Sequence, residues 1–148
     1  MEQEQQPRTQ DRDRIQAALT ALAGFLRTAA SEGWQRVDLA ARIVSDAGET
    51  ELFESMADGS TVPMSVDEPQ LLELLRELRD AEYDPETGAW FSLRMYVPEG
   101  DWWLAENHHL EPGWRVPPAD EKYHEDLARY PRESDELPPW LSAKVPSA

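Results

Sequence analysis

The chain has 148 residues, 40% of them hydrophobic and including six Trp, which suits one domain with a sizeable core and argues against a wholly disordered chain. Thirty Asp and Glu against fourteen Lys and Arg give a net charge of −16, a field that repels nucleic acid and anionic lipid and attracts basic partners. The chain has no cysteine, which excludes disulfides, a thiolate nucleophile and cysteine-ligated metal sites. Charge alone fits equally well a protein that is acidic only to stay in solution.

The first nine residues are predicted to be a disordered tail, because they are polar and contain Pro7 and no apolar residue after Met1. We assign residues 10–148 to a single domain. The N-terminus lacks the basic and apolar regions of a signal peptide. No apolar run approaches the roughly 20 residues that cross a bilayer. We therefore expect a cytoplasmic protein.

The first half of the domain is predicted to be a helix followed by a three-stranded meander. The helix begins at Gln10 and ends near Gly33, and it has an apolar stripe of Ile15, Leu19, Leu22 and Leu26. Residues 37–43 alternate between apolar and mostly polar side chains, as in a half-buried strand. A second strand at residues 50–57 leads to the hairpin turn Asp58-Gly59. The third has Val62, Met64 and Val66 on one face, and Pro63 favours a place at the sheet edge.

The second half repeats the pattern of helix and then strands. Asp67 is placed to begin a helix, with Gln70 positioned for a capping box, and the helix ends near Tyr83. A hairpin follows, in which Phe91, Leu93, Met95 and Val97 face one way and Trp90, Ser92, Arg94 and Tyr96 the other. Its return strand is predicted at residues 102–107, with Trp102 and Trp103 on opposite faces. A loop over 108–118, a helix over 119–130 and an aromatic anchor at 138–141 complete the chain.

The predicted fold class is α+β. Hairpin connections favour antiparallel strands, so we expect an antiparallel sheet of about five strands, a meander plus a hairpin, with three helices packed on one face. The predicted order is α-β-β-β-α-β-β-α.

The C-terminal stretch YHEDLARYPRESDELPPWL, residues 123–141, resembles the end of the YezG-like immunity proteins, the antitoxins of bacterial polymorphic toxin systems. The similarity is in a tyrosine-containing helix, a Tyr-Pro-Arg step, an acidic linker and a Pro-Trp-Leu ending. The residues that carry it are Tyr123, Leu127, Tyr130, Pro131, Arg132, Leu137, Pro138, Trp140 and Leu141. The loop ENHHLEPGW at 106–114 resembles the family's acidic loop, although two histidines replace its usual Tyr and Asp. The resemblance implies a cytoplasmic α+β protein that binds and blocks a toxin, often a nuclease.

The residues themselves contain no motif of metal binding or catalysis. His108 and His109 are adjacent, so on an extended chain they point to opposite sides, and no HxxxH or HExxH spacing occurs. The sequence has no GxSxG, GxGxxG or Walker pattern. We therefore predict no catalytic residues, no metal ligands and no cofactor. An enzyme with paired carboxylates remains an alternative, which two acids with raised pKa values in one cleft would support.

The best candidate for partner contact is the acidic, Trp-containing segment between residues 99 and 136, which has eleven acids and four basic residues. Carboxylates around aromatic anchors suit an interface with a basic protein. The candidate partner-binding residues are Glu99, Asp101, Trp103, Glu106, His108, Glu111 and Trp114.

The sequence thus predicts an immunity protein that binds and blocks a cognate, basic protein toxin through an acidic surface, as a monomer or weak homodimer, without binding nucleic acid or membrane. The alternative is a non-catalytic binding or regulatory domain for another protein or a small ligand. A pocket between the sheet and the third helix, lined by Tyr96, Trp103 and Tyr123, would favour that alternative.

Overall fold

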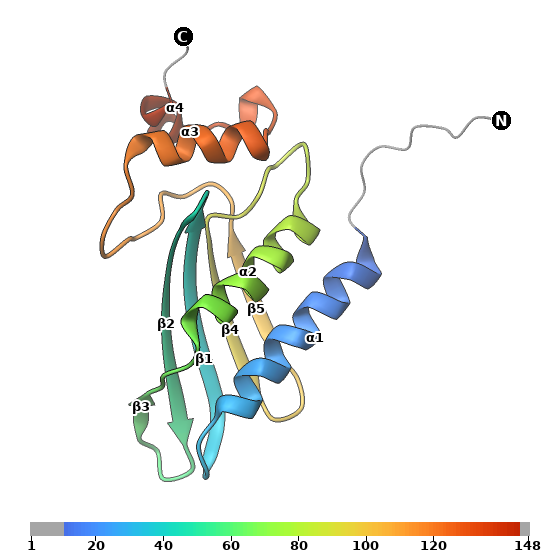
Figure 1. The fold of residues 1–148 in the computed structure, drawn as a ribbon, viewed down its shortest axis with the longest axis vertical. Helices are drawn as coiled ribbons and strands as arrows, with labels where there is room; N and C mark the ends of the chain where they lie inside the picture. Colours follow the sequence, from blue (N-terminus) through green and yellow to red (C-terminus); the bar gives the residue numbers. More distant parts are fainter. Residues whose placement is uncertain (1–10, 146–148) are drawn as a thin grey trace, which may run out of the picture.

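The computed structural model describes residues 11–145, and Figure 1 shows how the elements are arranged. In chain order they are helix α1 (Arg12–Ala29), strands β1 (Trp34–Val44), β2 (Ala47–Met56) and β3 (Thr61–Pro63), helix α2 (Glu68–Glu82), strands β4 (Ser92–Pro98) and β5 (Trp103–Asn107), helix α3 (Asp120–Arg129), the 3-10 turn η1 (Ser134–Glu136) and helix α4 (Pro139–Lys144). The predicted α+β class and order of elements are confirmed. The short turn η1 and helix α4 come in addition, and the predicted tail of residues 1–9 lies outside the described residues.

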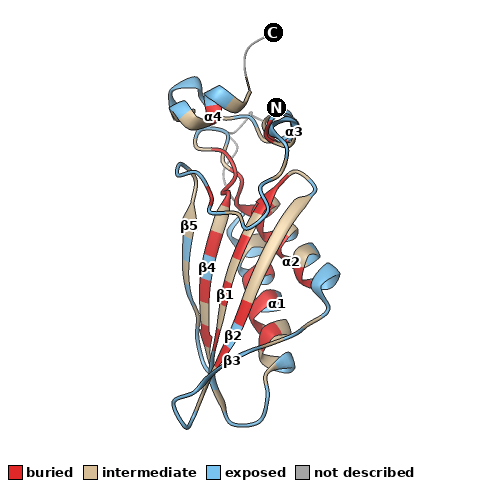
Figure 2. Ribbon diagram, turned by 90° about the vertical axis from the view of Figure 1, so that its left-hand side faces the viewer, coloured by how far each residue is buried: buried red, intermediate tan, exposed pale blue. Residues whose placement is uncertain are grey.

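The strands form one antiparallel sheet in the order β3-β2-β1-β4-β5. Helices α1 and α2 lie side by side on one face of this sheet, and none of the helices within residues 11–145 covers the other face, which we call the bare face (Figures 1 and 2). The edge position of the strand that contains Pro63 is confirmed, since a proline cannot donate a ladder hydrogen bond.

Period-two alternation places the main core between the sheet and the two helices. Val37, Leu39, Ala41 and Ile43 of β1 are all at most 2% exposed, and they pack with the leucine stripes of α1 and α2. Side-chain caps begin both helices. Asp11 accepts hydrogen bonds from the Asp13 and Arg14 amides, and Asp67 accepts one from the Gln70 amide. Such caps satisfy amides that the first helical turn leaves unpaired.

The C-terminal module, residues 119–145, packs over one end of the sheet (Figure 1). It has its own apolar cluster, in which Tyr123 and Leu141 pack against Val44 and Phe91. The prediction that the third helix packs on the same face as the first two is therefore wrong for α3. Its apolar residues are covered by the turns at the sheet end and by the chain's own C-terminal segment.

The alternation predicted around the second hairpin is wrong at its first two residues. Trp90 is fully buried in the main core, whereas Phe91 belongs to the cluster beneath the C-terminal module. The chain bends at Phe91 and β4 begins only at Ser92, so period two does not extend back to these residues. From Ser92 onward the predicted faces are confirmed. Trp102 packs against the main core, and Trp103 lies on the bare face with 51% of its surface exposed.

Within residues 11–145 no helix has the length and apolar character needed to span a membrane.

A buried ion pair joins the C-terminal module to α2. The guanidinium of Arg79 donates two hydrogen bonds to the carboxylate of Asp126, at 2.7 and 2.8 Å, and its Nε donates to the carbonyl oxygen of Trp90. Asp126 also accepts from the amide of Ser45, in the turn between β1 and β2. Both side chains are 3% exposed. One bidentate pair therefore connects α2, α3 and two turns of the sheet.

We expect Asp126→Ala to lower the free energy of unfolding by about 3–5 kcal/mol, because it leaves the Arg79 charge buried and unpaired. The neighbouring, exposed Glu125→Ala should cost less than about 1 kcal/mol. Urea unfolding of both variants measures the difference. Equal losses would mean that the buried pair does not hold the module.

Candidate partner-binding surfaces

The seven residues predicted for partner contact do not gather in one place. Glu99 and Asp101 are exposed in the turn between β4 and β5, and Trp103 lies on the bare face. Glu106 and His108 are half-buried, and the β4–β5 register turns the Glu106 side chain toward the helices.

The other two predicted residues belong to residues 108–118, which we call the crossing loop. Glu111 is exposed and lies 3.4 Å from the ammonium of Lys144. Trp114 packs against the cluster of the C-terminal module, and its Nε1 donates to the hydroxyl of Tyr123. Of the three tryptophans in this segment, Trp103 is thus the one that leaves most of its apolar surface for a partner.

One row of the sheet ladder carries aromatic side chains across the bare face. Pairing aligns Pro63, Phe53, Asp38, Tyr96 and Trp103, one residue from each strand, and we call this set the aromatic row. Tyr96 and Trp103 stack with ring centroids 4.9 Å apart, and Phe53 is 39% exposed. Exposed Trp and Tyr are the side chains most enriched among interface hot spots. The aromatic row is therefore a candidate partner surface.

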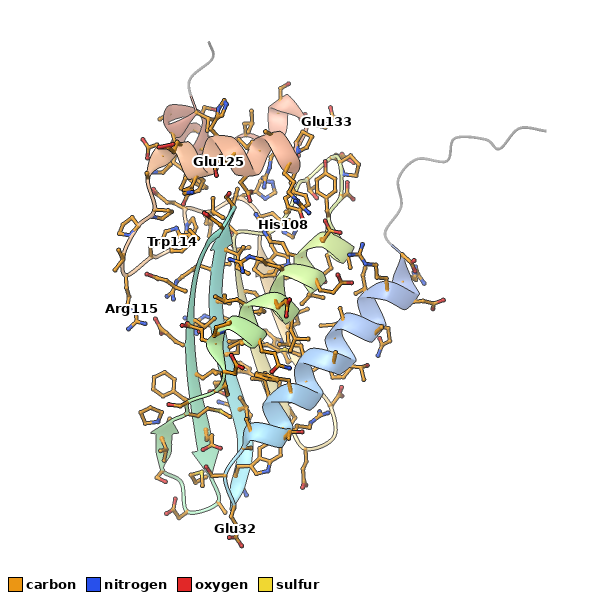
Figure 3. The ribbon with its side chains drawn as sticks, in the orientation of Figure 1. Glu32, His108, Trp114, Arg115, Glu125 and Glu133 are labelled. Carbon is orange, nitrogen blue, oxygen red and sulfur yellow. The ribbon has the colours of Figure 1, made fainter. Side chains whose placement is uncertain are left out.

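The crossing loop passes over the bare face beside the aromatic row. The carboxylate of Glu49 on β2 accepts hydrogen bonds from the amides of Arg115 and Val116, at 2.9 and 2.7 Å. Under the loop is a hollow of about 310 Å³, whose lining includes Ala40, Arg94 and Gly113. Figure 3 shows Trp114 and Arg115 on this loop.

The bare face is the part of the molecule where basic and acidic groups balance. Its arginines are Arg36, Arg42, Arg94 and, from the crossing loop, Arg115; its carboxylates are Asp38, Glu49 and Glu51. Four of the fourteen basic residues thus face this side of a chain with a net charge of −16. The acid excess of the described residues therefore lies outside the bare face.

A cleft of about 540 Å³ opens between α2 and α3. Six carboxylates line it, against three arginines, and they are Asp46, Glu73, Glu77, Asp80, Glu125 and Asp126. Asp126 is neutralised by Arg79, whereas Glu73 forms no ion pair with any described residue. A hydrogen bond from Tyr130 lowers the pKa of Asp80, so this carboxylate is ionised at neutral pH. Asp80 forms an ion pair with Arg14, and Asp46 forms one with Lys122, so these two basic residues offset part of the negative charge of the cleft.

Two glutamates form a buried carboxyl pair beneath the C-terminal module. Glu82 is 9% exposed, its Oε1 accepts a hydrogen bond from Trp90 Nε1 at 3.0 Å, and it shares a second hydrogen bond with Glu106. Burial, together with the neighbouring Glu106, raises the pKa of Glu82 to about 9. Glu82 is therefore protonated at neutral pH and donates to the Glu106 carboxylate. Glu82 lines neither the cleft nor the hollow, whereas Glu106 does line the hollow, so the two carboxyls do not face one open cleft as the enzyme alternative requires.

His108 lies close to this pair. Burial lowers its pKa, against the opposing effect of the Glu106 charge. The sequence predicted that His108 contacts a partner, and its side chain is half-buried. Along residues 11–145 no group of three or more His, Asp or Glu side chains is arranged to hold a metal ion.

The pocket that would favour a small-ligand domain does not form. Tyr96 and Trp103 lie on the bare face, whereas Tyr123 is buried in the cluster of the C-terminal module. The hollow on the bare face and the acidic cleft were not predicted. Alternation did place Arg94 and Tyr96 on the outward face, but the residues of a ladder row are known only from the strand register.

No protein-family model and no curated protein sequence matches this chain.

Several of the residues that carry the resemblance to YezG-like proteins form hydrogen bonds between the C-terminal module and the rest of the domain. Trp140 Nε1 donates a hydrogen bond to the carbonyl oxygen of His109. The hydroxyl of Tyr83 donates a hydrogen bond to the carbonyl oxygen of Pro131. Arg132 donates to the carbonyl oxygens of His108 and Ala89. Its guanidinium lies so close to Gly88 that a Cβ there would be 2.5 Å from Nε, and Gly88 also has a φ of +85°.

We expect Glu82→Gln to flatten the decline of stability toward alkaline pH. The folded-state pKa of Glu82 is raised, so its contribution is fully present below the unfolded pKa near 4.3 and is lost as pH rises toward about 9. A glutamine keeps a donor and an acceptor without ionising. The variant should therefore gain on the order of 1–3 kcal/mol over the natural chain between pH 5 and pH 8.5.

Urea unfolding at the two pH values measures this gain. Glu86→Gln, in the exposed turn after α2, is the matched control and should leave the pH dependence unchanged. Parallel pH profiles for the natural chain and Glu82→Gln would contradict the assignment of a proton to Glu82.

Proposed function

We propose that this chain is an immunity protein that binds and blocks a cognate protein toxin through an acidic surface. The observation that carries the proposal is the cleft between α2 and α3, which has carboxylates on both walls in a chain with a net charge of −16. The C-terminal resemblance to YezG-like immunity proteins supports the same function.

The charge suits a toxin that acts on nucleic acid. A nuclease must hold phosphates, so its active-site cleft is basic. Carboxylates of this protein would take the places of phosphates and occlude that cleft. Complementary charge also accelerates encounter, to 10⁸ M⁻¹s⁻¹ or above at low salt as an order of magnitude. Inhibition of this kind needs no bond to be made or broken by the immunity protein.

The aromatic row favours a second, non-catalytic reading, in which the chain is a binding or regulatory domain for a protein unrelated to toxins. Both proposed functions involve a protein partner, and they differ in the identity of that partner. A genetic test separates them.

The immunity function is tested with the gene next to this one. We expect it to encode a secreted protein with a toxic C-terminal domain, whose production in a bacterial host stops growth. Production of this chain in the same cells should restore growth, and the two purified proteins should form a complex. Continued killing in the presence of folded chain would contradict the proposal.

Charge reversal in the cleft should slow association with that toxin. We expect Glu73→Lys combined with Glu125→Lys to reduce the association rate about tenfold at low salt, because both carboxylates line the cleft. Glu32→Lys is the control, since Glu32 is exposed at the opposite end of the molecule from Glu125 (Figure 3).

Stopped-flow fluorescence measures these rates at two salt concentrations. The difference between the cleft variant and the control should shrink at high salt, where exposed charges are screened. Equal association rates for all three proteins would exclude the cleft as the contact surface.

A further inference from the structure

The hollow under the crossing loop has the chemistry of a receptor for a negatively charged group. We propose that it receives a carboxylate side chain of the protein that docks on the aromatic row, with Arg94 as the counter-ion. This inference rests on the proposed function only in that the chain binds a protein. It adds a second contact, with the opposite charge preference to that of the acidic cleft.

Small side chains make the room for such a group. Strand register places Glu51, Ala40, Arg94 and Ala105 in one ladder row, directly beside the aromatic row. The two alanines flank Arg94 on the neighbouring strands, so the guanidinium has open space on either side. Gly113 of the crossing loop also lines this space.

The hollow offers two hydrogen-bond donors, on Arg94 and Ser92, and its lining also includes Glu106, whose Oε2 has no hydrogen-bond partner among the described residues. Arg94 makes no hydrogen bond or ion pair with any residue in the described range. Ser92 Oγ accepts from Asn107 Nδ2 at 3.0 Å, which leaves the hydroxyl hydrogen for another acceptor. Both Asn107 side-chain atoms are engaged, because Nδ2 also donates to the carbonyl oxygen of Leu110 and Oδ1 accepts from the Leu110 amide. A carboxylate supplies acceptors only and so matches this set.

The charges of the bare face separate Arg94 from the other arginines. Arg36 pairs with Asp38 at 2.6 Å, Arg42 with Glu51 at 3.1 Å, and Arg115 lies 3.6 Å from the same Glu51. Arg94 is thus the cation of this face whose charge is not compensated by a described carboxylate. An arginine whose planar guanidinium has no partner can donate two parallel hydrogen bonds to one carboxylate.

The surroundings of the hollow favour a protein side chain over a free small molecule. The hollow is at the lower end of the size range of small-molecule pockets, roughly 300–1,000 Å³. The row of Ala40, Arg94 and Ala105, which lines the hollow, is next to the aromatic row, where Trp103 and Phe53 are 51% and 39% exposed and offer apolar contact to a protein. A second copy of this chain is a poorer occupant, because two bodies of charge −16 repel each other.

Two substitutions test the hollow in different ways. Arg94→Gln removes the charge and keeps the space, whereas Ala105→Leu fills the space and keeps the charge. Both residues are exposed, so the fold should persist, which circular dichroism and urea unfolding check. Arg12→Gln, at an exposed position in helix α1, is the control for the change in net charge.

The first measurement uses sodium acetate as the probe and follows the arginine Nε–Hε signals by NMR, with sodium chloride as the ionic-strength control. We expect a saturable shift of the Arg94 signal with acetate in the natural chain and in Arg12→Gln, and none in Ala105→Leu. Absence of a saturable shift in the natural chain, or an equal shift in Ala105→Leu, would overturn the proposal.

The second measurement uses the toxin domain from the growth experiment. Arg94→Gln and Ala105→Leu should each raise its Kd about tenfold, and Arg12→Gln should leave it unchanged. Losing a positive charge makes this chain more acidic, so long-range attraction to a basic toxin would predict tighter binding, and a loss of affinity identifies a local contact. If the natural chain binds and both hollow variants bind equally well, the hollow is excluded and the immunity function stands. If the natural chain protects no cell, the immunity function fails and the acetate titration alone decides on the hollow.

Discussion

The acidic cleft and the position of the C-terminal module depend on the buried pair of Arg79 and Asp126. Both side chains are only 3% exposed, so each charge is tolerable because the other charge, the Trp90 carbonyl and the Ser45 amide satisfy its hydrogen bonds. The pair fixes α3 against α2 and thereby sets the width of the acidic cleft. It also holds the end of the sheet from which the crossing loop departs.

Two surfaces of different chemistry lie on different sides of the molecule. Acidic residues concentrate around the α2–α3 cleft, whereas the bare face presents aromatic rings and nearly balanced charge. A partner that met only the cleft would be attracted quickly but held by exposed, salt-screened pairs. Apolar contact on the aromatic row would add slow dissociation and selectivity, which charge alone supplies poorly. The proposed immunity function would require that selectivity.

The buried carboxyl pair shows why an acidic composition is an unreliable guide to an acidic surface. Glu106 was predicted to face a partner, yet the register of β5 turns it toward the helices and against Glu82. Glu82 can be buried beside the Glu106 carboxyl only if one of the two groups keeps its proton, because two adjacent negative charges away from water would repel each other. Two of the thirty acids therefore contribute at most one charge, and that charge lies inside the fold.

Period-two and period-3.6 patterns, helix caps and turn residues determined the helices, the strands, their order and the opposite faces of Trp102 and Trp103. They succeeded because each is a local property of the backbone that a short window of residues already specifies. Only the tertiary structure decided that α3 covers the sheet end, that Phe91 leaves the main core, and that Phe53, Tyr96 and Trp103 share one row. Those outcomes depend on strand register and on packing between residues far apart in the chain. A shift of register by one residue would exchange the faces of a strand while leaving every local pattern unchanged.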